Sequence, residues 1–260
     1  MEMRSALELL GEFTAEQWGL VTLQQAKKSG VDAVTMHRLK EAGFLAHVRR
    51  GVYAATAAVP TTARDEQAAW LTFDPATPAW ERDPLDTTGG VVSHASACRL
   101  HEVGEFVTDR ITFTVPRRRT SRDPDLRFKI ASLTEQDVVL LDGLPVTTMA
   151  RTVQDLLAEN ADASHLATII RQAVESGQLR LDTFVEQIAP YARRYRVRPD
   201  DGAALLEHLL SHIGLSAERL LIRPQPRSAE ASAALASEAI LQLREMAEGN
   251  KGERTPRERN

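Results

Sequence analysis

The chain has 260 residues, a formal net charge of −4 and one cysteine, and 43% of its residues are hydrophobic. This length accommodates one or two domains with a self-supporting core. The lone Cys98 excludes an intramolecular disulfide framework and a zinc module built from several cysteines. No apolar run approaches the roughly 20 residues of a membrane-spanning helix, and the N-terminus is not typical of a secretory signal. We therefore expect a cytoplasmic protein without membrane contact.

The first 43 residues predict three helices and a short strand. Residues 4–16 place apolar side chains on one helical face, and residues 19–22 form a short apolar strand. Thr22 and Gln25 have the spacing of a capping box, which starts a second helix. Asp32 is placed to cap a third helix, which Gly43 ends.

A hairpin follows these helices. Residues 45–48 and 52–55 read as two short strands, and Arg49-Arg50-Gly51 joins them. Helix, strand, helix, turn, helix and hairpin is the order of elements in a winged helix-turn-helix. We therefore expect a DNA-binding domain over residues 1–60.

In such a domain the second helix of the pair enters the major groove. With Met36 and Leu39 facing inward, Arg38 can donate two hydrogen bonds to guanine, and the hairpin arginines suit phosphates or a narrow minor groove. Free N–H groups at the start of the preceding helix also suit a phosphate. The residues predicted to contact DNA are Thr22, Gln24, Val34, Thr35, His37, Arg38, Lys40, Arg49 and Arg50.

The rest of the chain predicts a mixed domain over residues 61–248 and a disordered tail over residues 249–260. The fold class is therefore α+β, with a winged helix-turn-helix followed by a mixed α+β domain that ends in a helical bundle. Strands are expected at 110–115, 127–131 and 138–141, and helices at 62–73, 93–100, 148–158, 162–176, 182–195, 200–213 and 228–247.

A loop with several arginines follows the strand at 110–115, because Pro116 ends that strand. Adjacent like charges repel one another, so this group has no evident structural cause. We hypothesise that it meets a polyanion, either operator DNA or an RNA or nucleotide. The residues concerned are Arg117, Arg118, Arg119 and Arg122.

Catalytic and metal sites are not predicted. None of the five lysines has an acidic residue two positions before it, so the metal-dependent nuclease signature is absent. His94, Cys98 and His101 share a helical face and could contribute to a zinc site, but a packed helix of small residues is the favoured interpretation. Arg151 and Asp155 are expected to form a structural ion pair. We expect no catalytic residue, no metal and no cofactor.

The stretch GLVTLQQAKKSGVDAVTMHRLKEAGFLAHVRRGVYAAT resembles the N-terminal domain of the AbiEi family of bacterial antitoxins. The segments SHASACRLHEVG, RITFTVPRRR and DGLPVTTMARTVQDLLAE resemble the antitoxin domain that follows it in that family. The resemblance implies an antitoxin of a type IV toxin–antitoxin system, and some such systems act in abortive infection against phage.

Such an antitoxin binds inverted repeats of operator DNA and represses its own operon. It also counters a nucleotidyltransferase-like toxin through its C-terminal domain, without a need for direct contact. The alternatives are a stand-alone winged-helix repressor with a small-molecule sensor domain and a nuclease guided by a winged helix. The lysine positions disfavour the nuclease.

Overall fold

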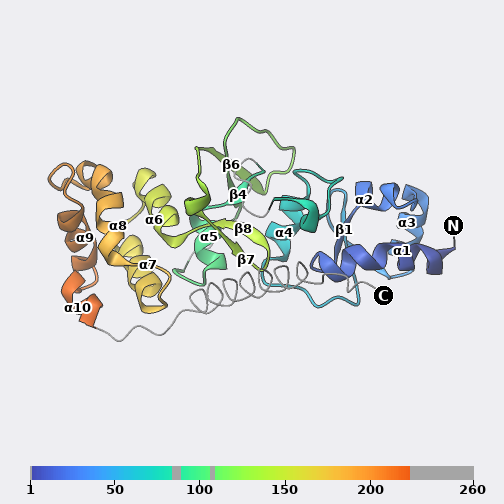
Figure 1. Ribbon diagram of the computed structural model, residues 1–260, viewed down its shortest axis with the longest axis horizontal. Coiled ribbons are helices and arrows are strands. Elements are labelled where there is room, and N and C mark those ends of the chain that lie inside the picture. The colour runs from blue at the N-terminus through green and yellow to red at the C-terminus, as the bar shows by residue number, and fades with distance from the viewer. Residues whose placement is uncertain (1, 84–88, 106–108, 223–260) are drawn as a thin grey trace, which may run out of the picture. The chain divides into compact units, whose positions relative to one another are not determined.

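The computed structural model describes residues 2–83, 89–105 and 109–222, which divide into two compact units between Ala161 and Asp162 (Figure 1). The predicted helix at 228–247 and the predicted tail at 249–260 lie outside the described residues. Within the described ranges, the helices are too short or too polar to cross a membrane.

The N-terminal part of the first unit is a winged helix-turn-helix, as the sequence predicts. Its three strands form an antiparallel sheet in the order β1-β3-β2, with Leu20 opposite Ala54 and Leu45 opposite Ala55. The elements in chain order are α1 (Met3–Glu16), β1 (Leu20–Thr22), α2 (Leu23–Lys28), α3 (Ala33–Glu41), β2 (Leu45–Arg49) and β3 (Val52–Ala55).

The helix starts follow from the predicted caps. The Thr22 hydroxyl accepts from the Gln25 backbone N–H at 3.0 Å, and the Gln25 side chain accepts from the Thr22 N–H at 2.9 Å. Asp32 Oδ1 accepts from the Thr35 N–H at 2.7 Å. That hydrogen bond favours the ionised carboxylate and lowers the pKa of Asp32. Both caps fix where α2 and α3 begin.

A mixed five-stranded sheet forms the centre of the first unit, with strand order β6-β5-β4-β8-β7. β5 pairs in parallel with β6 and antiparallel to β4, and β8 pairs in parallel with β4 and antiparallel to β7. Helix α5 packs on β5 and β8 and against α6 (Figure 1). The elements are α4 (Arg64–Leu71), η1 (Ala79–Glu81), β4 (Val91–Val92), α5 (His94–Leu100), β5 (Ile111–Val115), β6 (Leu126–Ile130), η2 (Glu135–Asp137), β7 (Val138–Leu141), β8 (Leu144–Thr147) and α6 (Met149–Ala158).

Three strands differ from the sequence prediction, and one of them, the two-residue β4, was not among the expected strands. The expected strand at 110–115 alternates apolar and polar residues, but every residue of β5 is buried because the strand lies inside the sheet. β8 was not predicted, because Pro145 within it disfavours a strand. The Asp142-Gly143 dipeptide is typical of a turn, and both residues have positive φ, as a tight hairpin requires.

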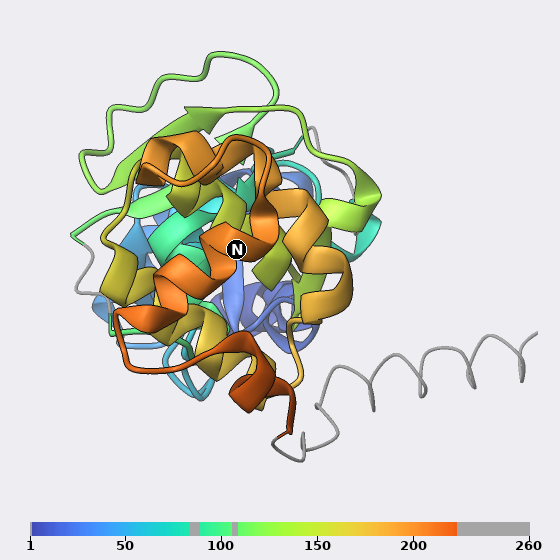
Figure 2. The same ribbon diagram turned by 90° about the vertical axis from the view of Figure 1, so that its left-hand side faces the viewer.

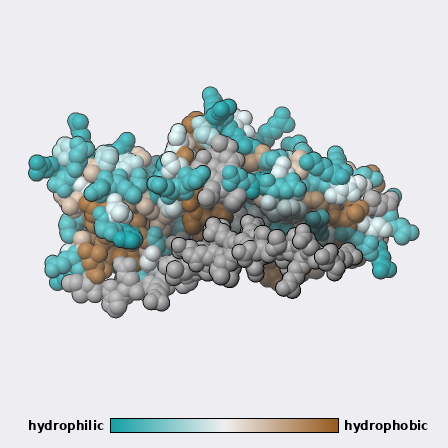
Figure 3. All heavy atoms as spheres, in the orientation of Figure 1, coloured by the Kyte–Doolittle hydropathy of each residue, from teal (hydrophilic) through white to brown (hydrophobic). Residues whose placement is uncertain are grey.

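The loop between β5 and β6, residues 116–125, joins two neighbouring parallel strands without a helix. The chain must return along the whole strand within this loop, and a helix usually covers such a connection. Here the loop arches away from the sheet, at the top of Figure 1, and hydrophilic side chains cover it in Figure 3. Its arginines are thereby presented on an open face.

One apolar core crosses the expected boundary at residue 60. Leu20, Val52 and Ala54 of the winged helix belong to the same buried cluster as Trp70 and Phe113 of the central sheet region. Trp18 Nε1 also donates to the Asp142 carbonyl at 2.6 Å. The winged helix and the five-stranded sheet therefore share their packing, and the compact units divide about a hundred residues later, after Ala161.

The second unit is a helical bundle, as predicted, made of α7 (Ala163–Glu175), α8 (Leu181–Ile188), η3 (Ala189–Tyr195), α9 (Gly202–Ser211) and α10 (Ala217–Ile222) (Figure 2). The expected helix at 182–195 is α-helical only to Ile188, and a 3-10 segment containing Pro190 follows. α9 packs against both α7 and α8. The α+β fold class is confirmed.

Candidate nucleic-acid interface

Helix α3 presents one polar face to solvent. Met36 and Leu39 are buried, whereas Val34 is 60% exposed. His37, Arg38 and Lys40 are also exposed, so these four side chains can reach a groove together. Lys40 is paired with Glu41 at 3.1 Å, which reduces the net positive charge at the C-terminal end of the helix.

Thr35 is different from its neighbours on α3. It is only 2% exposed, so its side chain does not share the face of Arg38 and cannot meet a base edge in this structure. The expected outward position of Thr35 is wrong, because it lies next to Met36 on the inward side of a short helix that starts at Asp32. The predicted DNA-contacting residues of α3 that are exposed are therefore Val34, His37, Arg38 and Lys40.

Thr22 is also withdrawn from solvent. Besides capping α2, its hydroxyl donates to the Pro75 carbonyl, and the residue is fully buried. The proposed phosphate contact of the Thr22 side chain is thus replaced by an internal hydrogen bond. Gln24, the second residue of α2, remains exposed and keeps the position expected for a phosphate contact.

A buried pair of glutamine side chains at the start of α2 was not predicted from the sequence. The Gln17 and Gln25 side chains exchange two hydrogen bonds, at 3.0 and 3.1 Å, and Gln17 also accepts from the Ala79 N–H at 2.8 Å. Both residues are fully buried. The pair fixes the start of α2 against the loop after α4. Only the capping role of Gln25 had a signal in the sequence.

The two arginines of the wing have different environments. Arg50 is exposed and lies beside Gly51, whose φ of +77° makes the turn. The Arg49 side chain is 11% exposed and forms an ion pair with Asp123 of the β5–β6 loop. A register shift between His47 and Arg49 interrupts the strand alternation just before this pair. Arg50 is therefore the wing arginine that is available to DNA.

The arginines of the β5–β6 loop also divide into two kinds. Arg117, Arg118 and Arg122 are exposed, as the polyanion hypothesis requires. Arg119 instead stacks over the Phe73 ring at 4.3 Å and donates to the Phe73 carbonyl at 2.9 Å. Its partial burial lowers the pKa of Arg119 from its usual value, although the group stays charged. Arg119 thus holds the loop in place.

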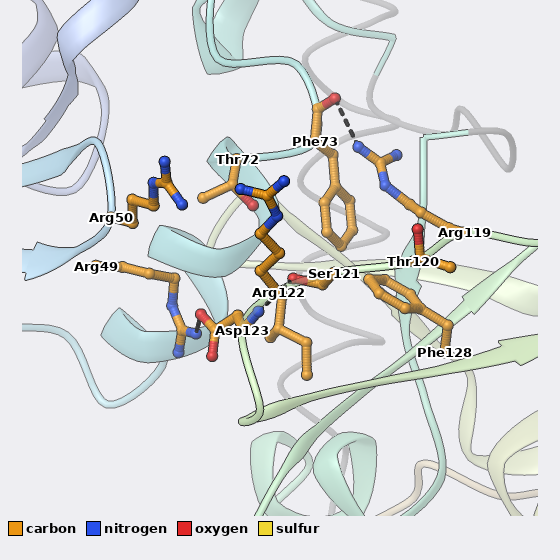
Figure 4. A pocket seen from close by; sticks show the side chains of 11 residues that line it. Arg49, Arg50, Thr72, Phe73, Arg119, Thr120, Ser121, Arg122, Asp123 and Phe128 are labelled. Atoms are coloured by element: carbon orange, nitrogen blue, oxygen red, sulfur yellow. Dashed lines mark hydrogen bonds and ion pairs between the residues drawn. The ribbon is translucent and has the colours of Figure 1, made fainter.

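Wing and loop together line a half-open pocket of about 400 Å³ (Figure 4). Figure 4 shows Arg50 on the wing side and the rings of Phe73 and Phe128 on the opposite side, with Arg122 between them. The pocket contains one carboxylate, that of Asp123. It is lined by Arg49, Arg50, Thr72, Phe73, Arg119, Thr120, Ser121, Arg122, Asp123, Leu126 and Phe128.

A second group of charges surrounds His94 at the start of α5. His94 has a φ of +56°, and its Nε2 lies 3.7 Å from Glu159 and its Nδ1 4.0 Å from Asp155. Burial lowers the pKa of His94 and outweighs the two carboxylates, while burial raises the pKa of Asp155. Arg151 donates to Asp155 at 2.9 Å, which confirms the predicted ion pair.

The positions of Cys98 and His101 do not support a zinc site together with His94. Cys98 is fully buried, and His101 Nε2 lies 2.8 Å from the Thr147 carbonyl oxygen rather than beside His94. Among the described residues, no group of three His, Cys, Asp or Glu side chains is placed to hold a metal ion. The favoured interpretation of a packed helix agrees with the complete burial of Cys98.

The N-terminal segment is similar to a known protein family. Residues 8–56 match the family described as "Transcriptional regulator, AbiEi antitoxin", which confirms the resemblance noted in the sequence for this segment. No curated protein matches the chain. Among solved structures, the RV2827C protein from Mycobacterium tuberculosis is similar over 84% of this chain and 80% of that chain, with 15% identity and a TM-score of 0.49.

Proposed function

We propose that the protein is a DNA-binding autorepressor and antitoxin of a bacterial toxin–antitoxin operon. The family match over residues 8–56 supports a transcriptional regulator of the AbiEi antitoxin type, a role that is not enzymatic. The observation that carries the proposal is that both the outer face of α3 and Arg50 of the wing are exposed. Those are the two elements with which a winged helix meets DNA.

In this proposal α3 enters the major groove. Arg38 donates to guanine, Val34 contacts a thymine methyl group, and His37 donates to a base or phosphate. Lys40 and Gln24 are both exposed and bind phosphates. Arg50 contacts the DNA backbone or enters a narrow minor groove. Two copies of the chain then occupy the two halves of an inverted repeat.

The same proposal assigns the neutralising role to the residues that follow the winged helix. They counter a nucleotidyltransferase-like toxin, without a need for direct contact. The exposed arginines of the β5–β6 loop, Arg117, Arg118 and Arg122, extend the basic surface toward a polyanion. This surface lies in the same compact unit as the wing.

A mobility-shift experiment with the full chain tests the repressor role. The probe is the DNA upstream of the protein's own gene, and the control is a fragment of equal length with its inverted repeats scrambled. Specific binding, at least about a thousand times tighter than to the scrambled fragment at the same salt concentration, is expected. Equal affinity for both fragments would refute operator recognition. Coexpression with the neighbouring toxin gene, scored by growth, tests the antitoxin role separately.

A further inference from the structure

We propose that the pocket between the wing and the β5–β6 loop binds a free nucleoside polyphosphate. The pocket of about 400 Å³ falls in the size range of small-molecule sites. Its lining combines a strongly positive side, an apolar aromatic side and several hydroxyl groups. These three features correspond to the phosphates, the base and the sugar of one ligand.

The charge of the pocket calls for a ligand with several negative charges. Four arginines line it against the single carboxylate of Asp123. Arg49 and Arg119 are held by Asp123 and by Phe73, so their guanidinium groups are already ordered. Arg50 and Arg122 are exposed and have no partner among the described residues. Two fixed and two unpaired guanidinium groups suit a chain of phosphates, which accepts paired hydrogen bonds from arginine.

The aromatic side distinguishes a free nucleotide from the backbone of duplex DNA. Phe73 and Phe128 lie with their ring centroids 5.8 Å apart, and both line the pocket beside Leu126. Phosphates of a duplex gain nothing from such a surface, because the bases are stacked inside the helix. An unstacked base gains affinity by stacking on an aromatic side chain. Arg119 already covers one face of the Phe73 ring, so Phe128 is the ring that favours a ligand with an exposed base.

Hydroxyl groups complete the lining. Thr72 lies at the end of α4, and Thr120 and Ser121 belong to the loop (Figure 4). A hydroxyl group can donate a hydrogen bond to a ribose or a base edge and can also accept one. The hydroxyl groups of the lining therefore do not restrict binding to a single base. The pocket is thus suited to the nucleotide class.

Arg50 belongs both to this pocket and to the proposed DNA surface. A bound polyphosphate would occupy the guanidinium group that the wing offers to the operator, so nucleotide and DNA are expected to compete. Binding of the nucleotide itself does not depend on operator recognition. Direct titration without DNA therefore tests this inference separately from the proposed function.

The test is isothermal titration of the full chain with ATP and GTP, compared with inorganic triphosphate and with the free nucleosides. At least one nucleoside triphosphate is expected to bind more tightly than inorganic triphosphate. Arg122→Ala should weaken this binding about tenfold or more, because a charge-assisted hydrogen bond is lost. Phe128→Leu, which keeps an apolar side chain, should remove most of the advantage over inorganic triphosphate.

The matched control is Arg4→Ala, which removes an equal charge from an exposed position on α1 and should leave nucleotide binding unchanged. Circular dichroism of each variant verifies the fold. Lack of nucleotide binding at millimolar concentration would overturn the inference. It would also be overturned if inorganic triphosphate bound as tightly as the nucleotides, or if Arg122→Ala and Arg4→Ala behaved alike.

Discussion

Arg49 of the wing is ion-paired with Asp123 of the β5–β6 loop, whereas the next residue, Arg50, is exposed. The pair connects two segments separated by more than seventy residues. Because the Arg49 side chain is 11% and the Asp123 side chain 23% exposed, solvent screens the pair only in part. The two adjacent arginines therefore have different roles: Arg49 joins the wing to the β5–β6 loop, and Arg50 is exposed for binding.

Arg49→Ala should lower the free energy of unfolding by about 1–3 kcal/mol, because Asp123 loses its charged partner in a mostly buried position. Arg50→Ala should change stability by less than about 0.5 kcal/mol, as is usual for exposed positions. It should weaken binding to all DNA sequences alike and reduce the salt slope by about one unit. Urea unfolding and mobility shifts measure the two effects. Equal stability of the two variants would contradict this division.

Arg38→Ala tests base recognition by α3. We expect a loss of about 1–3 kcal/mol in operator affinity and a relaxed preference at one or two base pairs, since a bidentate contact to guanine is removed. Thr35→Ser, which keeps a hydroxyl at the buried neighbouring position, should leave the base preference unchanged. Binding-site selection from a randomised half-site measures both variants. A wild-type preference in Arg38→Ala would exclude this residue as a base contact.

The order of elements in the winged helix was predictable because local signals determine it. The capping box at Thr22, the Asp32 cap and the alternating hairpin all act within a few residues. The burial of Thr22 and Thr35 and the partial burial of Arg49 were not predicted. Thr22 and Arg49 are covered by partners that are distant in the sequence, and the burial of Thr35 depends on how α3 is rotated about its axis. The Pro75 carbonyl lies 53 residues from Thr22, and Asp123 lies 74 residues from Arg49. No local pattern contains such contacts.

The shared core predicts that the winged helix cannot be removed cleanly. A chain that starts at residue 61 lacks Leu20, Val52 and Ala54, which pack with Trp70 and Phe113. The apolar surface that this truncation exposes should bind the dye ANS. The truncated chain should also unfold at a lower temperature than a chain of residues 1–222. Thermal unfolding with dye fluorescence compares the two chains. Wild-type stability of the shorter chain would show that residues 61–161 form an independent core.

Cys98 should be unreactive in the native protein. Burial raises the pKa of its thiol to about 12, so almost no thiolate is present between pH 7 and 9. Iodoacetamide should label the unfolded chain rapidly and the native chain only at the rate of unfolding. Mass spectrometry of timed samples, with and without urea, measures this difference. Rapid native labelling at pH 8 would show that α5 opens readily.

Two helical glycines should respond to alanine in opposite directions. Gly202 begins α9, and a Cβ built there would lie 1.9 Å from the Val185 backbone carbonyl oxygen. Backbone cannot yield as a flexible side chain does, so α8 and α9 must separate, at a cost of about 1–3 kcal/mol or more. Gly11 lies within α1, and a Cβ there meets nothing within 4 Å.

Gly11→Ala should therefore stabilise the protein by about 0.5–1 kcal/mol, because alanine loses less backbone entropy in a helix. Urea unfolding followed by helical circular dichroism compares each variant with the wild type. Hydrogen exchange then locates the change, in α8 and α9 for Gly202→Ala and in α1 for Gly11→Ala. If Gly202→Ala were as stable as the wild type, the close approach of α9 to the Val185 carbonyl would be wrong. A destabilised Gly11→Ala would show that the surface beside α1 is occupied.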